Sequence, residues 1–303
     1  MIRDRDPIQR PDSPHPLFVE TQGAGVPILC LHGHPGSGRS MRVFTRHLSQ
    51  RFRTIAPDLR GYGRSRSTGA FAMEAHITDL VALLDRLEIP QVLVLGWSLG
   101  GILAIELALR HPDRVSGLIL VATAARPRSA PMPSHWRDEV YTAIAALLNW
   151  LRPGWRWNIQ NFGRRSLLRY LIRQHEPTTY RYLAESALAD FWQTSRAATG
   201  ALAKALRQGY DRQPALSEIH CPALVLAGAE DRHITPTASQ DTATALQDCR
   251  WHCYRDVAHL FPWEIPDRVL ADIDRWLGDR LDSLPHHPSG VDRSARDGHT
   301  SDR

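Results

Sequence analysis

One short stretch constrains the fold of this chain more than any other. An apolar run, residues 92–95, passes directly into Gly96-Trp97-Ser98-Leu99-Gly100, and residues 99–110 continue with the pattern of a helix. The two glycines permit a turn so sharp that Ser98 is held in strained backbone geometry, with its side chain clear of both elements. The free N–H groups of the helix point at the same place, which favours a negatively charged oxygen there. The stretch therefore predicts a buried strand, a sharp turn carrying a reactive serine, and a helix.

On either side of this stretch, strand and helix patterns alternate along the chain. The expected strands are 17–21, 27–31, 52–56, 115–121, 223–228 and 250–254, and the expected helices outside the interruption described next are 40–50, 73–87, one after Pro236, and 266–281. Such alternation predicts an α/β fold with a mostly parallel central sheet flanked by helices.

Residues 126–214 interrupt the alternation. The segment has helical patterns at 137–151, 166–175 and 178–206 and no strand signal, so we expect an inserted helical cap. The flanking pieces, 17–125 and 215–282, would form one catalytic domain. Charged and proline-rich residues 1–16 predict a flexible N-terminal segment, and the polar composition of 283–303 predicts a disordered tail.

The basic character of the chain belongs to the predicted cap. The net charge is +5, but residues 126–212 hold 14 basic and 6 acidic residues, while the rest of the chain holds 23 and 26. A single lysine, Lys204, against 36 arginines does not suggest a nucleic-acid groove. With no signal-peptide pattern and no apolar run of membrane-spanning length, we expect a cytoplasmic protein.

Tryptophans and arginines are mixed in the cap, and two interpretations stay open. Residues 147–157 hold three tryptophans, and Arg164, Arg165, Arg169 and Arg173 follow before the next acidic residue, Glu176. In one interpretation the cap is a lid whose arginines are merely solvated. In the other, the arginines and aromatics form a docking surface for an anionic carrier protein or a membrane.

The four cysteines do not suggest a disulfide framework, because they are few and widely spaced. A zinc site built from Cys249, His252 and Cys253 is a conceivable alternative, but the usual C-x-x-C spacing is missing. We therefore expect no metal and no cofactor.

A serine needs a neighbouring base and a group that orients this base before it becomes a nucleophile. Asp231 follows the predicted strand 223–228, and His259 follows the last strand, so the chain order is serine, acid, histidine. Glu230 is a rival for the acid. Two backbone N–H groups, those of Leu99 and of His34 in the glycine-rich loop 32–38, would converge above Ser98 as an oxyanion hole.

These motifs resemble those of the α/β-hydrolase superfamily over nearly all of 17–281 outside the insert. Residues 32–36 (His-Gly-His-Pro-Gly) are similar to its oxyanion loop, 58–65 (Asp-Leu-Arg-Gly-Tyr-Gly-Arg-Ser) to a second conserved loop, and 228–231 to its acid loop. The resemblance implies a Ser98 nucleophile, a His259 base and an Asp231 acid. One departure is Ala258, where relatives commonly have glycine.

The resemblance also narrows the activity. A serine nucleophile attacks carbonyl carbon, and the elbow Gly-Trp-Ser-Leu-Gly-Gly is similar to that of carboxylesterases acting on pimeloyl-carrier-protein methyl esters. We expect cleavage of a small-molecule or carrier-bound acyl substrate, with Trp97 as a candidate substrate-binding residue. A carbon–carbon bond hydrolase or perhydrolase with the same triad is an alternative. A ligand receptor or accessory protein with little turnover is an alternative of another class.

Overall fold

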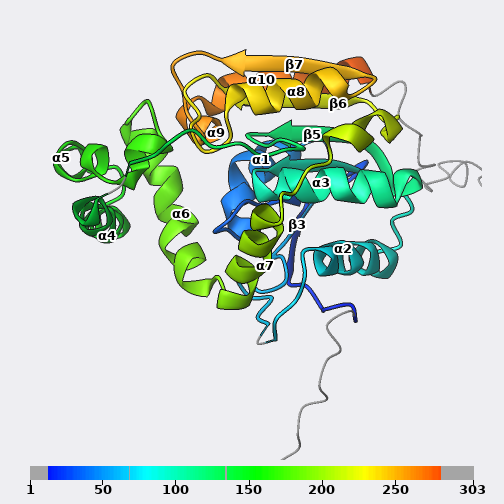
Figure 1. The fold of residues 1–303 in the computed structure, drawn as a ribbon, viewed down its shortest axis with the longest axis horizontal. Coiled ribbons are helices and arrows are strands. Elements are labelled where there is room, and N and C mark those ends of the chain that lie inside the picture. Colours follow the sequence, from blue (N-terminus) through cyan, green and yellow to red (C-terminus); the bar gives the residue numbers. More distant parts are fainter. Residues whose placement is uncertain (1–12, 68, 134, 281–303) are drawn as a thin grey trace, which may run out of the picture.

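A seven-stranded sheet forms the centre of the computed structural model, which describes residues 13–280 apart from 68 and 134 (Figure 1). The strand order is β1-β3-β2-β4-β5-β6-β7. The strands are β1 (Val19–Gln22), β2 (Pro27–Leu31), β3 (Arg53–Pro57), β4 (Val92–Trp97), β5 (Val115–Val121), β6 (Ala223–Gly228) and β7 (Cys249–Tyr254). Every neighbouring pair is parallel except β1 with β3, which confirms the predicted, mostly parallel sheet.

Helices cover both faces of the sheet because its central strands are apolar on both sides. All residues of β2, β4 and β6 are buried, as expected for parallel strands between two helical layers. Helices α2 (Glu74–Arg86), α3 (Leu99–Arg110) and α8 (Pro236–Ala245) contribute to one hydrophobic cluster. Helices α1 (Arg42–Leu48), α9 (Phe261–Glu264) and α10 (Pro266–Arg280) contribute to the other.

Four helices lie between β5 and β6: α4 (Trp136–Leu151), α5 (Arg156–Asn161), α6 (Pro177–Gln193) and α7 (Arg196–Arg207). Among the described residues of 126–214 there is no strand, in agreement with the expected helical insert. Figure 1 shows α4 and α5 projecting beyond one end of the sheet, with α6 between them and the sheet. The cap boundaries at 126 and 214 stay a prediction.

Two predicted helices in this region are wrong in detail. Residues 166–175 form no α-helix: short 3₁₀ turns lie at Gly163–Arg165 and Leu167–Tyr170, and the Leu167 N–H donates to the Thr142 hydroxyl at 2.9 Å. The predicted helix 178–206 is two helices, α6 and α7. Ser195 separates them, because its N–H donates to the Gly61 carbonyl and its hydroxyl caps α7.

The predicted strands are correct to within about two residues at their ends. The proposed tail 283–303 and most of the proposed flexible segment 1–16 lie outside the described residues. Within the described part of the chain, no helix combines the length and the apolar character needed to cross a membrane.

Candidate active site

Ser98 lies at the turn between β4 and α3, with the backbone strain that the sequence predicts. Its φ is +53° and its ψ is −115°, a region that residues other than glycine rarely adopt. The Ser98 N–H donates to the Val121 carbonyl at 2.9 Å, and its carbonyl accepts the Thr123 hydroxyl at 2.8 Å. A Cβ atom at Gly96 would collide with the Gly100 backbone. The turn is therefore fixed by its neighbours, and the serine side chain stands at the carboxyl end of the sheet.

The structure brings the three predicted polar residues together from three loops. His259 Nε2 lies 3.2 Å from Ser98 Oγ, and His259 Nδ1 lies 2.8 Å from Asp231 Oδ2. The other Asp231 oxygen accepts the N–H groups of His233 and Ile234 at 2.8 and 2.9 Å. An ionised carboxylate only accepts hydrogen bonds, so Nδ1 carries the proton and Nε2 can accept one from the serine.

Burial strengthens this hydrogen-bonded chain. The side chains of Ser98, Asp231 and His259 are each less than a tenth exposed. In surroundings of low polarity an aligned hydrogen bond is stronger than in water, and it holds the imidazole in one orientation. The arrangement is the one that general-base activation of a serine requires.

The geometry answers two questions about the sequence: whether Glu230 replaces Asp231, and whether Ala258 can stand where relatives commonly have glycine. Glu230 is exposed and makes no hydrogen bond with His259 in the described structure, so it does not occupy the position of the acid. Ala258, where relatives commonly have glycine, does not adopt a positive φ. Alanine therefore costs no backbone strain at this position.

The proposed oxyanion-hole donors belong to two elements that meet beside Ser98. Leu99 is the first residue of α3, so its N–H has no partner within the helix. Gly33 precedes His34, and a Cβ there would come within 2.7 Å of the Trp97 ring and 3.2 Å of Ser98 Cβ. Only glycine allows the loop to approach the serine this closely.

The side chains of two histidines hold this loop in place. The buried His32 donates through Nδ1 to the Gly33 carbonyl at 2.8 Å and accepts the Leu59 N–H at Nε2 at 3.1 Å. Burial lowers its pKa to about 4, so it is neutral in this role. His34 Nδ1 lies 3.0 Å from the Tyr62 hydroxyl, and burial lowers the pKa of this imidazole as well.

Two more rings lie against His259. The His233 ring is 4.7 Å from the His259 ring, and burial, followed by the proximity of His259, lowers the pKa of His233 to about 4. Trp97 is buried, with its ring 5.7 Å from His259 and 4.6 Å from Trp263. Trp97 therefore borders the site, and its substrate contact stays a prediction. The sequence signal that could have pointed to His233 is its place two residues after Asp231.

Glu264 is a second residue that sequence reasoning missed. Its buried carboxylate accepts the backbone N–H groups of Ala258 at 2.9 Å, Arg173 at 2.9 Å and Gln174 at 2.5 Å. It thus ties the loop that carries His259 to the cap. Burial raises the pKa of this carboxyl group, although the three donors oppose the shift.

Residues 13–280, without 68 and 134, contain no group of three or more His, Cys, Asp or Glu side chains placed to hold a metal ion. The zinc alternative is therefore not supported. His252 packs its ring on Tyr254, and its Nε2 lies 3.9 Å from Asp272. Burial is the main cause that raises the pKa of the nearby Cys249 thiol to about 12.

A parallel sheet with a serine, a histidine and an acid at the carboxyl ends of its strands defines the class of this protein. The sequence profile of the alpha/beta hydrolase fold matches residues 26–266. The chain belongs to the α/β-hydrolase family and is an enzyme of hydrolase type, as the resemblance of its motifs implied.

Its relatives include named esterases. The chain is 32% identical over 226 residues to a pimeloyl-acyl-carrier-protein methyl ester esterase of Nitrosomonas europaea, covering 74% of this chain and 84% of the relative. It is 28% identical to the enzyme of the same name from Nitrosospira multiformis, covering 86% and 97%. Among solved structures, a thermophilic esterase from Thermogutta terrifontis is similar, with a TM-score of 0.63, 29% identity and coverage of 87% and 93%.

Proposed function

We propose that this enzyme cleaves a carboxylic ester or a related acyl substrate through a Ser98–His259–Asp231 triad and an acyl-enzyme intermediate. The observation that carries the proposal is the continuous hydrogen-bonded chain from Asp231 Oδ2 through both nitrogens of His259 to Ser98 Oγ. Asp231 keeps the imidazole in the tautomer that accepts the serine proton.

The proposed reaction has two halves. Ser98 Oγ attacks the substrate carbonyl carbon while its proton moves to His259 Nε2, and the backbone N–H groups of His34 and Leu99 stabilise the oxyanion. The tetrahedral intermediate then collapses, and the leaving alcohol takes the proton from His259. Water, deprotonated by the same imidazole, attacks the acyl-enzyme, and a second collapse releases the acid and returns the proton to Ser98.

Acyl methyl esters are the first substrates to test, because several relatives are named for a methyl ester of a carrier-bound acyl group. A carbon–carbon bond hydrolase or a perhydrolase would use the same residues, and a relative 26% identical is named a putative non-heme bromoperoxidase. Rates on esters, thioesters, lactones and vinylogous diketones, with and without peroxide, separate these activities. A receptor would turn over none of them.

Covalent labelling tests the nucleophile directly. A fluorophosphonate should increase the mass of the peptide that carries Ser98 by the mass of one bound probe. Ser98→Ala should abolish both labelling and turnover while leaving the circular dichroism spectrum unchanged. Loss of a triad member costs on the order of 10⁴ to 10⁶ in rate. Ser49→Ala is the matched control, because Ser49 is partly exposed and, within the described structure, its hydroxyl donates to the Arg46 carbonyl. Labelling elsewhere, or a loss of only tenfold, would contradict the proposal.

A further inference from the structure

Helix α4 buries its polar side and exposes its apolar side. Its buried residues are Asp138, Ala145 and Asn149. Its exposed large apolar residues are Trp136, Val140, Leu147, Trp150 and Leu151. At 100° per residue these five side chains fall within one stripe about 100° wide. A surface helix of a soluble domain normally has the opposite arrangement.

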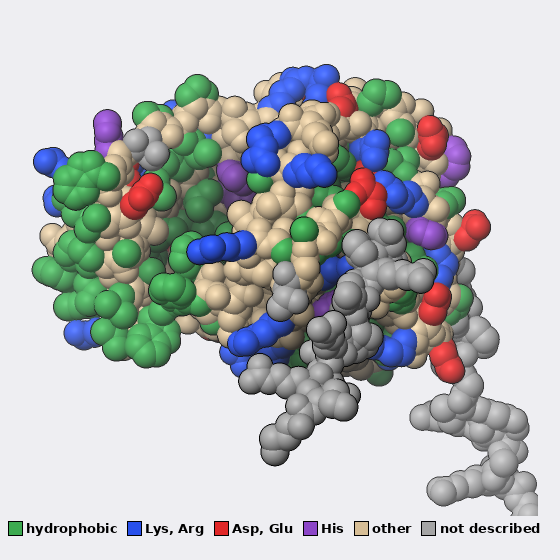
Figure 2. Space-filling view, turned by 60° about the horizontal axis from the view of Figure 1, so that its bottom comes forward, with side chains coloured by type: hydrophobic (Ala, Val, Ile, Leu, Met, Phe, Trp, Pro, Cys, Tyr) green, Lys and Arg blue, Asp and Glu red, His purple; other side chains and the backbone are tan. Residues whose placement is uncertain are grey.

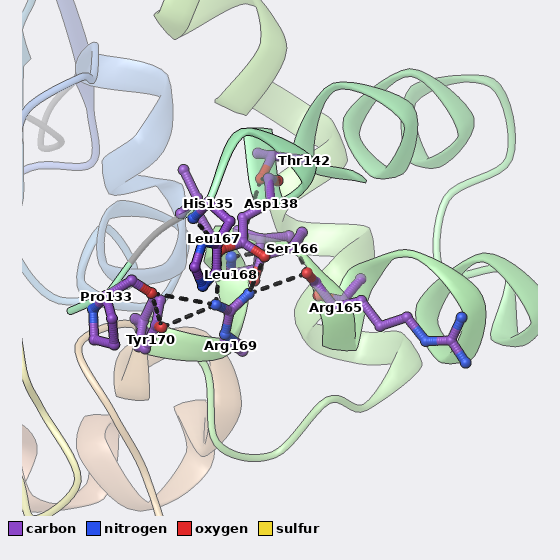
Figure 3. Close-up of polar contacts among 11 residues, drawn as sticks. Pro133, His135, Asp138, Thr142, Arg165, Ser166, Leu167, Leu168, Arg169 and Tyr170 are labelled. Carbon is purple, nitrogen blue, oxygen red and sulfur yellow. Dashed lines mark hydrogen bonds and ion pairs between the residues drawn. The ribbon is translucent and has the colours of Figure 1, made fainter. Parts of the chain in front are cut away.

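Specific polar contacts fix this orientation. The Asn149 side chain donates to the Tyr180 carbonyl at 2.7 Å and accepts the Gly154 N–H at 3.0 Å. Asp138 receives the Arg169 guanidinium at 2.7 and 2.8 Å, and Figure 3 shows this pair at the centre of a cluster of polar contacts. Rotation of α4 would leave these groups buried without partners, so the apolar stripe is held outward.

Helix α5 exposes a further tryptophan. Trp157 is 50% exposed and its ring stacks on Trp155 with 5.0 Å between centroids. We call Trp136, Val140, Leu147, Trp150, Leu151 and Trp157 the α4–α5 apolar face. Figure 2 shows hydrophobic side chains gathered at the end of the molecule where Figure 1 places these helices. Because α4 has 16 residues, the face is about 24 Å long.

Four arginines between the end of α4 and residue 165 form no ion pair within the described structure. Arg152, Arg156, Arg164 and Arg165 are exposed, and none forms an ion pair with a residue that the structure describes. Figure 3 shows the Arg165 side chain extending away from the Asp138–Arg169 cluster. From Val140 to His175 the sequence has six arginines and no acidic residue. Arg169 is the exception among them, because the Asp138 carboxylate binds it, so it does not contribute to a free basic surface.

We propose that the α4–α5 apolar face and its four arginines adsorb to the surface of a membrane that contains anionic lipids. Tryptophan side chains favour the headgroup region, arginines bind lipid phosphates, and a helix lying in the interface buries an apolar stripe of this kind. A second copy of the chain fits less well, because its own arginines would meet these arginines. An acidic carrier protein matches the charge but leaves a large tryptophan-rich face without an apolar partner.

Vesicle flotation tests the proposal with the whole chain. We expect binding to vesicles of equal phosphatidylglycerol and phosphatidylcholine, at least tenfold weaker binding to phosphatidylcholine alone, and weakening at about 0.5 M salt. The triple substitution Trp136→Ser, Trp150→Ser, Trp157→Ser should lower the partition coefficient at least tenfold. The triple substitution Arg156→Ser, Arg164→Ser, Arg165→Ser should lower the partition coefficient by a similar factor. Hydrolysis of a small soluble ester should stay unchanged in both variants.

Matched controls lie on other cap helices. Trp192→Ser removes a tryptophan that is 75% exposed near the end of α6, and the pair Arg196→Ser, Arg207→Ser removes two exposed arginines of α7. These controls should bind vesicles as the parent does. Equal losses in the controls, or no vesicle binding at all, would overturn the proposal. A dimer seen by light scattering would overturn the proposal, because a second copy would then cover the face in solution. Binding of an acidic carrier protein by a chain that does not bind vesicles would overturn it as well.

Discussion

Helices α3 and α4 have similar apolar content but opposite relations to the rest of the molecule. Ten of the twelve residues of α3 are buried, including Glu106, whose carboxylate binds Arg110 and Arg212 at 2.9 and 2.5 Å. Three of the sixteen residues of α4 are buried, and two of these are polar. Helix α3 is enclosed because it follows the central strand β4, between the sheet and further helices. Helix α4 lies at the outside of the cap, where packing covers one narrow side.

The difference shows that an apolar pattern locates a helix without saying which side will be buried. In α3, the position of the helix in the fold allows its apolar side chains to be buried, as the hydrophobic effect favours. In α4, a few buried hydrogen bonds and one ion pair decide the orientation, because leaving such groups without partners costs more than exposing an alkyl or indole group already partly in contact.

The largest expected effect concerns the candidate active site, at the carboxyl ends of the sheet strands that precede α3 and its neighbours. Asp231→Asn should lower kcat on a soluble ester on the order of 10⁴-fold with little change in stability, because asparagine cannot fix the same His259 tautomer. Steady-state kinetics and thermal melting measure the two quantities. Glu230→Gln is the adjacent control and should stay within about twofold of the parent. A damaging Glu230→Gln with a harmless Asp231→Asn would reverse the assignment of the acid.

The next effect concerns the joint between sheet and cap. Glu264→Gln replaces an acceptor oxygen with an amino group that faces a backbone N–H, so the free energy of unfolding should fall by about 2–4 kcal/mol. Because Glu264 bonds the Ala258 N–H next to His259, activity should fall as well. Urea unfolding and ester hydrolysis measure both. Glu176→Gln, an exposed position of the cap, is the control. Unchanged stability in Glu264→Gln would show that the joint is not held by this carboxylate.

The inverted packing of α4 makes a paired prediction about neighbouring residues. Asn149→Ala removes the partner of the Tyr180 carbonyl and the Gly154 N–H, so we expect a loss of about 2–3 kcal/mol. Trp150→Ser, one residue further and 56% exposed, should change the free energy of unfolding by less than about 0.5 kcal/mol. Chemical denaturation of the two variants compares them directly. A larger loss from Trp150→Ser would mean that the apolar side of α4 is the packed one.

The smallest effect concerns the contact of α6 with the glycine-rich loop 32–38, where the Ser37 hydroxyl donates to Asp190 at 2.5 Å. Burial, with a smaller contribution from the charge of Asp58, raises the pKa of Asp190 to about 6. The hydrogen bonds from Ser37 and Ser186 and the charge of Arg39 oppose this shift. The folded state then holds a proton that the unfolded state releases between about pH 4 and 6, so stability falls as pH rises through this window.

Asp190→Asn keeps an acceptor for the Ser37 hydroxyl and removes the charge. The variant should be more stable than the parent by about 1–2 kcal/mol at pH 8, and the difference should vanish near pH 4. Thermal unfolding across this range measures it, with Glu185→Gln, exposed on the same helix, as the control. A parent that gains stability from pH 4 to 7 relative to Asp190→Asn would show that the carboxylate is stabilised in its charged form.

Much of the fold followed from the sequence because its signals are local. Apolar runs of strand length, the glycines around Ser98 and the alternation of strands with helices each depend on a few neighbouring residues. The three polar residues of the site could be chosen because each follows a strand, and parallel strands end at one edge of the sheet. The helical pattern of 166–175 was misleading, because the N–H groups of Arg173 and Gln174 donate to the distant Glu264 carboxylate and not to carbonyls one turn earlier.

The sequence alone determined the strand order along the chain, the strained serine turn and the loops that carry Asp231 and His259, since sterics and short-range hydrophobic patterns act within a few residues. Only the tertiary structure decided that Glu264 holds the His259 loop, that Asp190 reaches Ser37, and that α4 turns its tryptophans outward. These outcomes depend on hydrogen bonds and ion pairs between residues distant in sequence. Their strength comes from burial, and burial exists only after the sheet and the cap have been assembled.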